Sequence, residues 1–440
     1  MRLVTDQAGP AGIEIEYRPY MNQHLTRLVI SFLLLGSAFS MCQASAWPTL
    51  QSRIQFGAIA NDSPSENVFP SGFLSFDEGI NLNRAELIVE KSPKSNIKPR
   101  IGPFPGPAPA ESDWGFEVDL RYGEDAAITY GLDDELSINE DKERLFLMPQ
   151  WFLNGYLPLA DGFSWIAGSW FTSLGYEIGA PVDPPTGFYT HSYAFVYQPV
   201  KHVGVMGALK LPVADEHGLW SLGLGLVQGW NNLQDNNDDK TLLFDLRWRS
   251  ADFRTWLDIE NIIGYEQSED GLTEQTRPFN AVSREGEKLL RRMHSVLLSH
   301  RFERIHRVAL NLVYGFQEGG DLVADSNNPP GFLITQDSRW YGANLNWYLQ
   351  WREDRQIGLR MEWFKDADGA HALLPAGIYR SLTANLSWWA KEGLRIRPEL
   401  RYDHYSGSGA PFGGRVPTAF FGEETHQWVV SLDVTWSYRL

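Results

Sequence analysis

Apolar and polar residues alternate along the last thirteen positions of the chain. One set of alternate positions carries large apolar or aromatic side chains: Trp428, Val430, Leu432, Val434, Trp436, Tyr438 and Leu440. From 431 on, the positions between them carry small polar or charged side chains: Ser431, Asp433, Thr435, Ser437 and Arg439. A period of two indicates a β-strand. Strands of soluble proteins average about five to six residues, whereas a tilted transmembrane strand needs about nine to eleven, so the length favours a strand that crosses a membrane.

The same alternation recurs upstream, for example in 355–364, where apolar Leu359, Met361 and Trp363 alternate with charged Arg360 and Glu362. Taken along the whole chain, the pattern predicts sixteen strands, at 52–60, 82–91, 114–122, 145–157, 163–171, 199–211, 218–230, 240–250, 253–264, 292–303, 305–317, 338–351, 355–366, 379–390, 393–404 and 427–440. Alternation alone is equally compatible with a soluble sandwich, in which the charged face would be outside.

The lengths of the connections separate these two folds. From the fourth strand on, each connection from an even to an odd strand is tight, whereas the odd-to-even connections are long and rich in Gly, Pro, Asn, Asp and Glu. The exception is 92–113, a Pro-rich even-to-odd connection. A soluble sandwich has no reason to sort its loops by strand parity, but an outer-membrane barrel has short periplasmic turns and long extracellular loops. The predicted fold class is therefore all-β, a transmembrane antiparallel β-barrel of about 16 strands with both termini on the periplasmic side.

Composition supports the barrel and narrows the function. The chain of 440 residues contains 17 Trp, 17 Tyr and 24 Phe, and no apolar run after the N-terminal region reaches the approximately 20 residues that a transmembrane helix needs. Its net charge of -17 argues against a nucleic-acid partner. The single cysteine, Cys42, lies in the N-terminal region, so a disulfide or a catalytic cysteine is not expected in the barrel.

The N-terminal region reads as a secretory signal. From Met21 it has a short polar stretch with Arg27, an apolar run over 28–35, and Ala44-Ser45-Ala46 before Trp47. This order predicts a signal peptide over 1–46, with translation starting at Met21 as an open alternative, and a barrel over 47–440. A membrane anchor is less compatible because the apolar run is too short to span.

If the apolar face of each strand meets lipid, the charged face lines the pore. The pore-lining residues predicted in this way are Arg395, Arg397, Glu399, Arg401, Asp403, Arg360, Glu362, Asp245, Arg247, Arg249, Arg254, Asp258 and Glu260. Such a lumen would select solutes by size and charge. The alternative is that many of these residues form ion pairs that stiffen the wall.

The third long loop, 172–198, combines acidic and aromatic residues, and we predict that it folds into the barrel and narrows the channel. Its candidate residues are Glu177, Asp183, Tyr189 and Tyr193, with the two carboxylates facing the arginine-rich wall. The neighbouring strands carry small residues on the facing side, Gly204, Ala208, Ser221, Gly223, Gly225 and Gly229, which would leave room for the loop. The alternative is a loop that packs over the outer rim.

Several passages resemble the OmpL-like putative beta-barrel porin family. They include 114–123 (WGFEVDLRYG), 171–177 (FTSLGYE), 188–195 (FYTHSYAF), 229–232 (GWNN) and 248–252 (WRSAD). The resemblance implies a porin-like barrel in the bacterial outer membrane that passes small solutes. It brings with it no catalytic residue and no defined substrate.

The expected function is therefore a water-filled channel for passive diffusion of small hydrophilic solutes or ions, not an enzyme. Two alternatives stay open: a channel specific for a sugar or an anionic nutrient, and a non-conducting surface or adhesion barrel. No cofactor and no metal site are expected, since the histidines show no ligand spacing such as HExxH. The expected partners are outer-membrane lipid, a possible homotrimer, and the outer-membrane assembly machinery, which would recognise the C-terminal strand 427–440.

Overall fold

The computed structural model describes most of the chain after the predicted signal segment. The described residues are 48–62, 79–93, 109–123, 145–177, 187–233, 235, 237–266, 288–303, 305–324, 333–370, 374–413 and 424–439. Every element described below belongs to the unit formed by residues 46–440. The predicted signal segment lies outside the described residues.

Sixteen strands form in the described part of the chain, in agreement with the predicted number. They are β1 Thr49–Asn61, β2 Gly79–Lys91, β3 Asp113–Gly123, β4 Leu145–Leu157, β5 Phe163–Phe171, β6 Lys201–Lys210, β7 Leu219–Val227, β8 Thr241–Arg249, β9 Thr255–Tyr265, β10 Leu290–Phe302, β11 His306–Ala324, β12 Leu333–Arg352, β13 Arg355–Asp366, β14 Gly377–Lys391, β15 Leu394–Gly407 and β16 His426–Arg439. Each strand pairs antiparallel with its neighbours in sequence.

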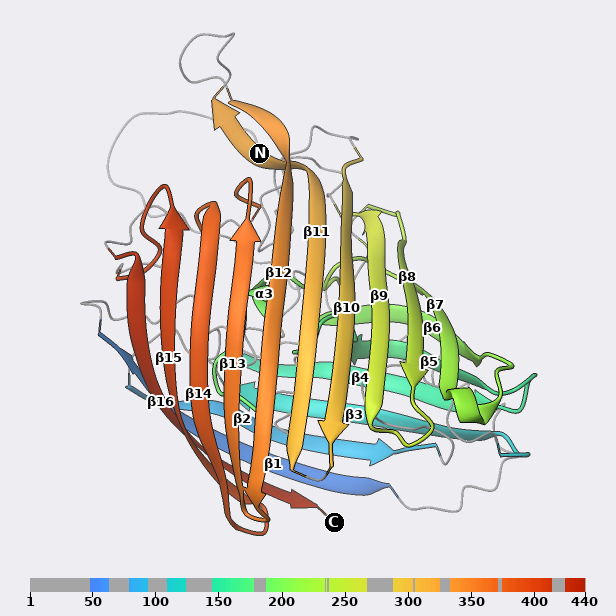
Figure 1. Cartoon of the computed structure of the whole chain (residues 1–440). Coiled ribbons are helices and arrows are strands. Elements are labelled where there is room, and N and C mark those ends of the chain that lie inside the picture. Colours follow the sequence, from blue (N-terminus) through green and yellow to red (C-terminus); the bar gives the residue numbers. More distant parts are fainter. Residues whose placement is uncertain are drawn as a thin grey trace, which may run out of the picture. The chain divides into compact units, whose positions relative to one another are not determined.

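The sheet closes on itself because β1 pairs with β16, so the strands form a closed barrel (Figure 1). Closure leaves no unpaired sheet edge, which is the condition for strands to cross a bilayer. The predicted fold class, an antiparallel barrel of sixteen strands, is confirmed.

The short connections, which lead from even-numbered to odd-numbered strands, lie at the rim where β1 begins and β16 ends. The sequence predicted this sorting of short and long connections. The connections 353–354 and 392–393 are two residues long, whereas 172–200 and 266–289 at the other rim are long. Gly393 has φ +75°, and a Cβ there would lie 2.2 Å from the Ser437 carbonyl oxygen, so this tight turn requires glycine. We call the two ends the short-turn rim and the long-loop rim.

Strands β11 and β12 extend further than the alternation predicted. Their pairing shifts register between Gln317 and Asp321 and then continues to Ala324 and Leu333, so the two strands run past their neighbours as a ribbon (Figure 1). Two short helices were also not predicted: α3 Tyr193–Val196 and the 3-10 helix η1 Asp215–His217. No helix in the described part of the chain is long and apolar enough to span a membrane.

Side chains of the strands alternate between an exposed outer face and a buried inner face. In β13, for example, Met361 and Trp363 are exposed, while Arg360, Glu362 and Phe364 are buried. Charged residues therefore point into the barrel and apolar residues point out, which is the reverse of a soluble protein.

Candidate functional site

The site is the interior surface of the barrel together with the described parts of the third long loop, 172–177 and 187–200. The loop leaves β5, and its later part contains α3, whose four residues are all buried and which lies against β12 and β13. Ser192 caps this helix, because its hydroxyl accepts a hydrogen bond from the Phe195 backbone N–H at 3.2 Å. The loop makes side-chain contacts with inward-facing residues of β12, β13, β14, β15 and β2.

Glu399 of β15 binds the loop at residues 189 and 190. Its two carboxylate oxygens accept hydrogen bonds from the backbone N–H groups of Tyr189, at 2.7 Å, and Thr190, at 2.9 Å. The Thr190 hydroxyl donates a third hydrogen bond to the same carboxylate at 2.5 Å. Hydrogen bonds to a charged acceptor are stronger than neutral ones, so this carboxylate fixes the backbone of the loop on the wall.

Glu177 and Arg360 form an ion pair between the loop and β13, with 2.7 Å between Oε1 and Nη1. The second oxygen of Glu177 accepts a hydrogen bond from the Ser192 N–H at 2.8 Å and lies 3.1 Å from His191 Nδ1. Burial alone would raise the pKa of Glu177, but the charge of Arg360 and the hydrogen bonds from His191 and Ser192 hold it at about 2. The carboxylate is therefore ionised at neutral pH and joins the two described parts of the loop to the wall.

Tyrosines of α3 and its C-terminal end reach carboxylates of β13 and β15. The Tyr193 hydroxyl donates to Asp403 at 3.0 Å, and the Tyr193 N–H donates to Glu362 at 3.0 Å. The Tyr197 hydroxyl donates to Asp366 at 2.8 Å. The contacts of Tyr193 bring a predicted loop residue onto two predicted wall residues, Asp403 and Glu362, whereas the pair of Tyr197 and Asp366 was not predicted.

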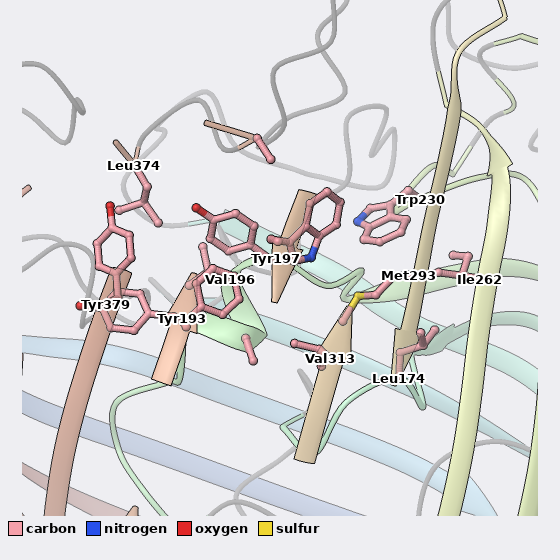
Figure 2. Close-up of a cluster of buried hydrophobic side chains, with 14 of the residues drawn as sticks. Leu174, Tyr193, Val196, Tyr197, Trp230, Ile262, Met293, Val313, Leu374 and Tyr379 are labelled. Carbon is pink, nitrogen blue, oxygen red and sulfur yellow. The ribbon is translucent and has the colours of Figure 1, made fainter. Parts of the chain in front are cut away.

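Apolar side chains of the loop pack into a larger apolar cluster inside the barrel (Figure 2). Tyr193, Val196 and Tyr197 from the loop face Tyr379, and the cluster continues through Trp230. Inward-facing Ile262, Met293 and Val313 of three further strands belong to the same cluster, together with Leu174 of the loop and Leu374 of the connection before β14. The loop is thus held by buried apolar area as well as by polar contacts.

Charges on β8 and β9 are paired within the wall. Arg249 binds Asp258 through its two terminal nitrogens: Nη1 donates to Oδ1 at 2.5 Å, and Nη2 donates to Oδ2 at 3.1 Å. Arg247 lies 2.8 Å from Asp245 and 3.4 Å from Glu260. Each of these residues is buried, so this part of the wall is a set of neighbouring ion pairs.

The wall formed by β15, β16 and β1 to β3 is also paired. Arg397 contacts Asp433 at 2.6 Å, and Arg395 lies 3.7 Å from the same carboxylate. Arg53 and Arg121 both bind Glu86. Asp433 was not among the predicted site residues, although its alternation parity places it on the inner face.

The buried residues include nearly equal numbers of basic and acidic side chains. Among the described residues, 12 Lys or Arg and 13 Asp or Glu are buried. The wall therefore contains many arginines, but their charge is largely compensated by neighbouring carboxylates.

The structure places the predicted site residues as follows. Buried and on the inner face are Arg395, Arg397, Glu399, Arg401, Asp403, Arg360, Glu362, Asp245, Arg247, Arg249, Asp258 and Glu260. The loop brings Glu177, Tyr189 and Tyr193 onto Arg360, Glu399 and Asp403. Asp183 lies outside the described residues.

The prediction that Arg254 lines the pore is wrong. β9 begins at Thr255, so Arg254 lies in the turn after β8, where its side chain is 51% exposed and pairs with Asp252 at 3.6 Å. The role predicted for the small residues of β6 and β7 stays a prediction; α3 itself lies against β12 and β13. At Gly223 the missing side chain makes room for the Asp245 carboxylate, since a Cβ would lie 2.3 Å from its oxygen.

Some residues that hold the loop were not predicted. Asn83 accepts a hydrogen bond from the Tyr189 hydroxyl at 3.0 Å, and it lies where the pairing of β1 and β2 shifts register, so alternation does not place it. A Cβ at Gly57 would lie 2.0 Å from that hydroxyl, so glycine at this position lets Tyr189 approach the wall. Tyr348 and Asn385, which bind Gly187, have the inward parity and could have been found from it.

No group of three His, Cys, Asp or Glu residues suited to a metal ion occurs within the described ranges.

Comparisons with known proteins agree with this architecture. The family described as putative beta-barrel porin-2, OmpL-like, matches residues 49–437. The outer membrane channel DcaP of Acinetobacter baumannii superposes with a TM-score of 0.53 at 10% identity, covering 90% of this chain and 99% of that one. An anion-selective porin from Comamonas acidovorans gives 0.52 at 8% identity, with 89% and 99% covered. The trimer form of Vibrio cholerae OmpT gives 0.50 at 8%, with 88% and 98% covered. Curated protein sequences give no match.

Proposed function

We propose a passive channel function for this chain, which belongs to the putative beta-barrel porin-2, OmpL-like family and is a porin of the bacterial outer membrane. The channel is water-filled and lets small hydrophilic solutes or ions diffuse across the membrane. The loop 172–198 narrows it by standing against the inner wall of β12 to β15.

The observation that carries this proposal is the set of contacts between the loop and the wall. Glu399, Arg360 and Asp403 each bind the loop through a charged group that is itself buried. A loop held in this way keeps a fixed position in the lumen and sets the cross-section of the water path. The rest of the predicted pore lining, apart from Arg254, lies on the inner face of the barrel wall.

Charge balance supports selection mainly by size. Because buried acids and bases are nearly equal in number, the field along the lumen is weak and should favour neither anions nor cations strongly. The proposal names a class of solute, small hydrophilic molecules or ions, and no single substrate. A sugar-specific or anion-specific channel, or a non-conducting adhesion barrel, would give different results in the experiment below.

Several features of the whole molecule belong to the same proposal. Residues 1–46 act as a cleaved signal peptide and 47–440 form the mature barrel, which sequencing of the mature N-terminus would test. The short-turn rim faces the periplasm and the long-loop rim faces outside. The barrel assembles as a homotrimer, and β16 is the segment that the assembly machinery recognises.

Single-channel recording in planar bilayers tests the function directly. We expect stepwise openings in wild type and a reversal potential close to zero in a salt gradient. Replacing Arg397 and Arg401 with Gln should shift the reversal potential towards cation selectivity, whereas the matched variant Arg254→Gln, at an exposed turn, should leave it unchanged.

The other outcomes decide between the alternatives. Current that saturates with one sugar in a series would replace the general channel by a specific one. A silent bilayer with folded protein, recognised by its heat-dependent mobility on gels, would favour the adhesion barrel.

A further inference from the structure

The outer face of the barrel carries a row of basic residues at the long-loop rim of β14, β15 and β16. Arg380 pairs in register with His404, and His404 pairs in register with His426. Directly opposed side chains on neighbouring strands have Cβ atoms about 5 Å apart. The three residues alternate with inward-facing Tyr379, Asp403 and Gln427, which are buried, so they lie on the outward face. We call Arg380, His404 and His426 the basic row.

Members of the basic row form no ion pair among the described residues. Arg380 donates a hydrogen bond to the Ser406 hydroxyl at 3.1 Å. This contrasts with the inner face, where arginines bind carboxylates. A protonated imidazole directly opposite Arg380 on the neighbouring strand would be a like charge, which is destabilising, so an anion bound between the two would be favoured.

Aromatic and then aliphatic residues follow the basic row towards the middle of the barrel wall. Trp363 pairs in register with Arg380 and is 40% exposed. Tyr402 of β15 and Trp428 of β16 lie two positions from His404 and His426 on the side away from the long-loop rim, and their rings are 4.8 Å apart. Leu400 and Val430 come next and are exposed. The order is that of a lipid, with a charged group at the rim, an interfacial layer and an acyl region.

We propose that the basic row binds the phosphate group of a membrane lipid headgroup at the long-loop rim. The phosphate oxygens accept hydrogen bonds from the Arg380 guanidinium and from the two imidazoles, which gain positive charge when protonated. The acyl chains of the same lipid lie along Leu400 and Val430. This inference concerns the outer face and does not depend on the channel function.

Native mass spectrometry of the purified, detergent-solubilised barrel tests the proposal. The probes are phosphatidic acid, which carries a phosphate monoester, and phosphatidylcholine with the same acyl chains. We expect wild type to prefer phosphatidic acid, and the variant Arg380→Gln/His404→Gln/His426→Gln to bind it at least about fivefold more weakly. Binding of phosphatidylcholine, whose phosphate charge is offset by its own choline cation, should change much less, and heat-dependent mobility on gels shows whether the variant is folded.

The matched control places the same change at the opposite rim. Arg254→Gln/Arg352→Gln/Arg355→Gln removes three cations of the short-turn rim, where Arg254 is 51% exposed and Arg355 34% exposed. It should bind phosphatidic acid as wild type does. If the triple variant of the basic row does not fold, Arg380→Gln alone should weaken the binding in the same direction.

Three results would overturn the proposal. The first is an unchanged preference for phosphatidic acid in the basic-row variant, and the second is an equal loss in the control variant. The third is full displacement of phosphatidic acid by an excess of inorganic phosphate, since this would show a simple anion site and not a lipid site. Single-channel conductance of the basic-row variant should equal that of wild type, so that failure here and failure of the channel function are distinguishable.

Discussion

The inner walls of β8–β9 and β12–β15 carry similar charged residues but use them differently. On β8 and β9 the charges bind each other, as Arg249 binds Asp258 within the same pair of strands. On β12 to β15 they bind the loop, as Arg360 binds Glu177 and Glu399 binds the backbone of Tyr189. The ion pairs of the first wall form without the loop, whereas in the second wall Arg360 meets its carboxylate partner, Glu177, only when the loop is in place. The same alternation of residues thus builds a stiff wall in one region and a docking surface in the other.

Replacing Arg360 with Ala should give the largest effect. It leaves Glu177 buried without its cation and removes two further hydrogen bonds from Arg360 to Thr190, so we expect a loss of about 3–5 kcal/mol in the free energy of unfolding. Urea unfolding in lipid vesicles measures this loss. The described loop should also become open to chymotrypsin, which cleaves after its aromatic residues.

Arg249→Ala is the matched change in the other wall. It should cost a similar free energy, because buried Asp258 then loses both hydrogen bonds from Arg249, but it should leave the loop resistant to chymotrypsin. If both variants make the loop equally sensitive to chymotrypsin, the conclusion that only the wall of β12 to β15 holds the loop is contradicted. Arg360→Lys, which keeps the charge, should restore part of the resistance.

The pH dependence of stability should identify the ion pair of Glu177. Its pKa is about 2 in the folded protein, below the ordinary 4.5, so the folded chain binds fewer protons than the unfolded chain between these values. The stabilisation, about 3 kcal/mol, is therefore complete above about pH 5 and is lost as the pH falls towards 2. The difference in unfolding free energy between wild type and Glu177→Gln should shrink over this range.

A matched variant separates this effect from general acid unfolding. Glu392 lies in an exposed turn at the short-turn rim. Glu392→Gln should follow wild type at every pH. A difference between wild type and Glu177→Gln that stays constant down to pH 2 would show that the pair does not hold the loop.

Glu399→Gln should have an intermediate effect. The amide keeps one oxygen for the loop, but the second acceptor and the negative charge are lost, while three donors of residues 189 and 190 stay in place. We expect a loss of about 1.5–3 kcal/mol in the free energy of unfolding. Greater noise in the open-channel current should accompany it, since the loop then moves against the wall, and current as quiet as in wild type would contradict this assignment.

The sequence predicted the barrel well because one physical rule acts along its whole length. Every strand must present apolar side chains to lipid, so the period of two and the parity of loop lengths were both readable, and β4, β5 and β13 have the predicted bounds. The inner face followed from the same parity, which placed Arg360, Glu399 and Asp403 correctly.

The partners of these residues could not be read in the same way. Which carboxylate meets the loop depends on how the chain folds back over several strands, as when Tyr193 reaches Asp403, 210 positions away. Local irregularities could not be predicted from the alternation either. The register shift that brings Asn83 to Tyr189 interrupts the period of two, and α3, with only four residues, is too short to show a helical period. Arg254 was assigned to the wall because the start of β9 was placed two residues too early.

Tyr193→Phe should give the smallest effect and the finest comparison of the two walls. The ring, which lies 4.7 Å from Tyr379, keeps its apolar contacts, and only the hydrogen bond to Asp403 is lost. Asp403 still binds Arg401 at 2.8 Å, so no charge is left unpaired and the loss should be about 0.5–1.5 kcal/mol. Tyr438→Phe, at an exposed position on the outer face, should cost less than this. Combining Tyr193→Phe with Glu399→Gln should cost less than the sum of the two if the loop docks as one unit, because each contact holds the other in place and either change alone already weakens both. Simple additivity would instead mean that the two contacts hold separate, independently moving parts of the loop.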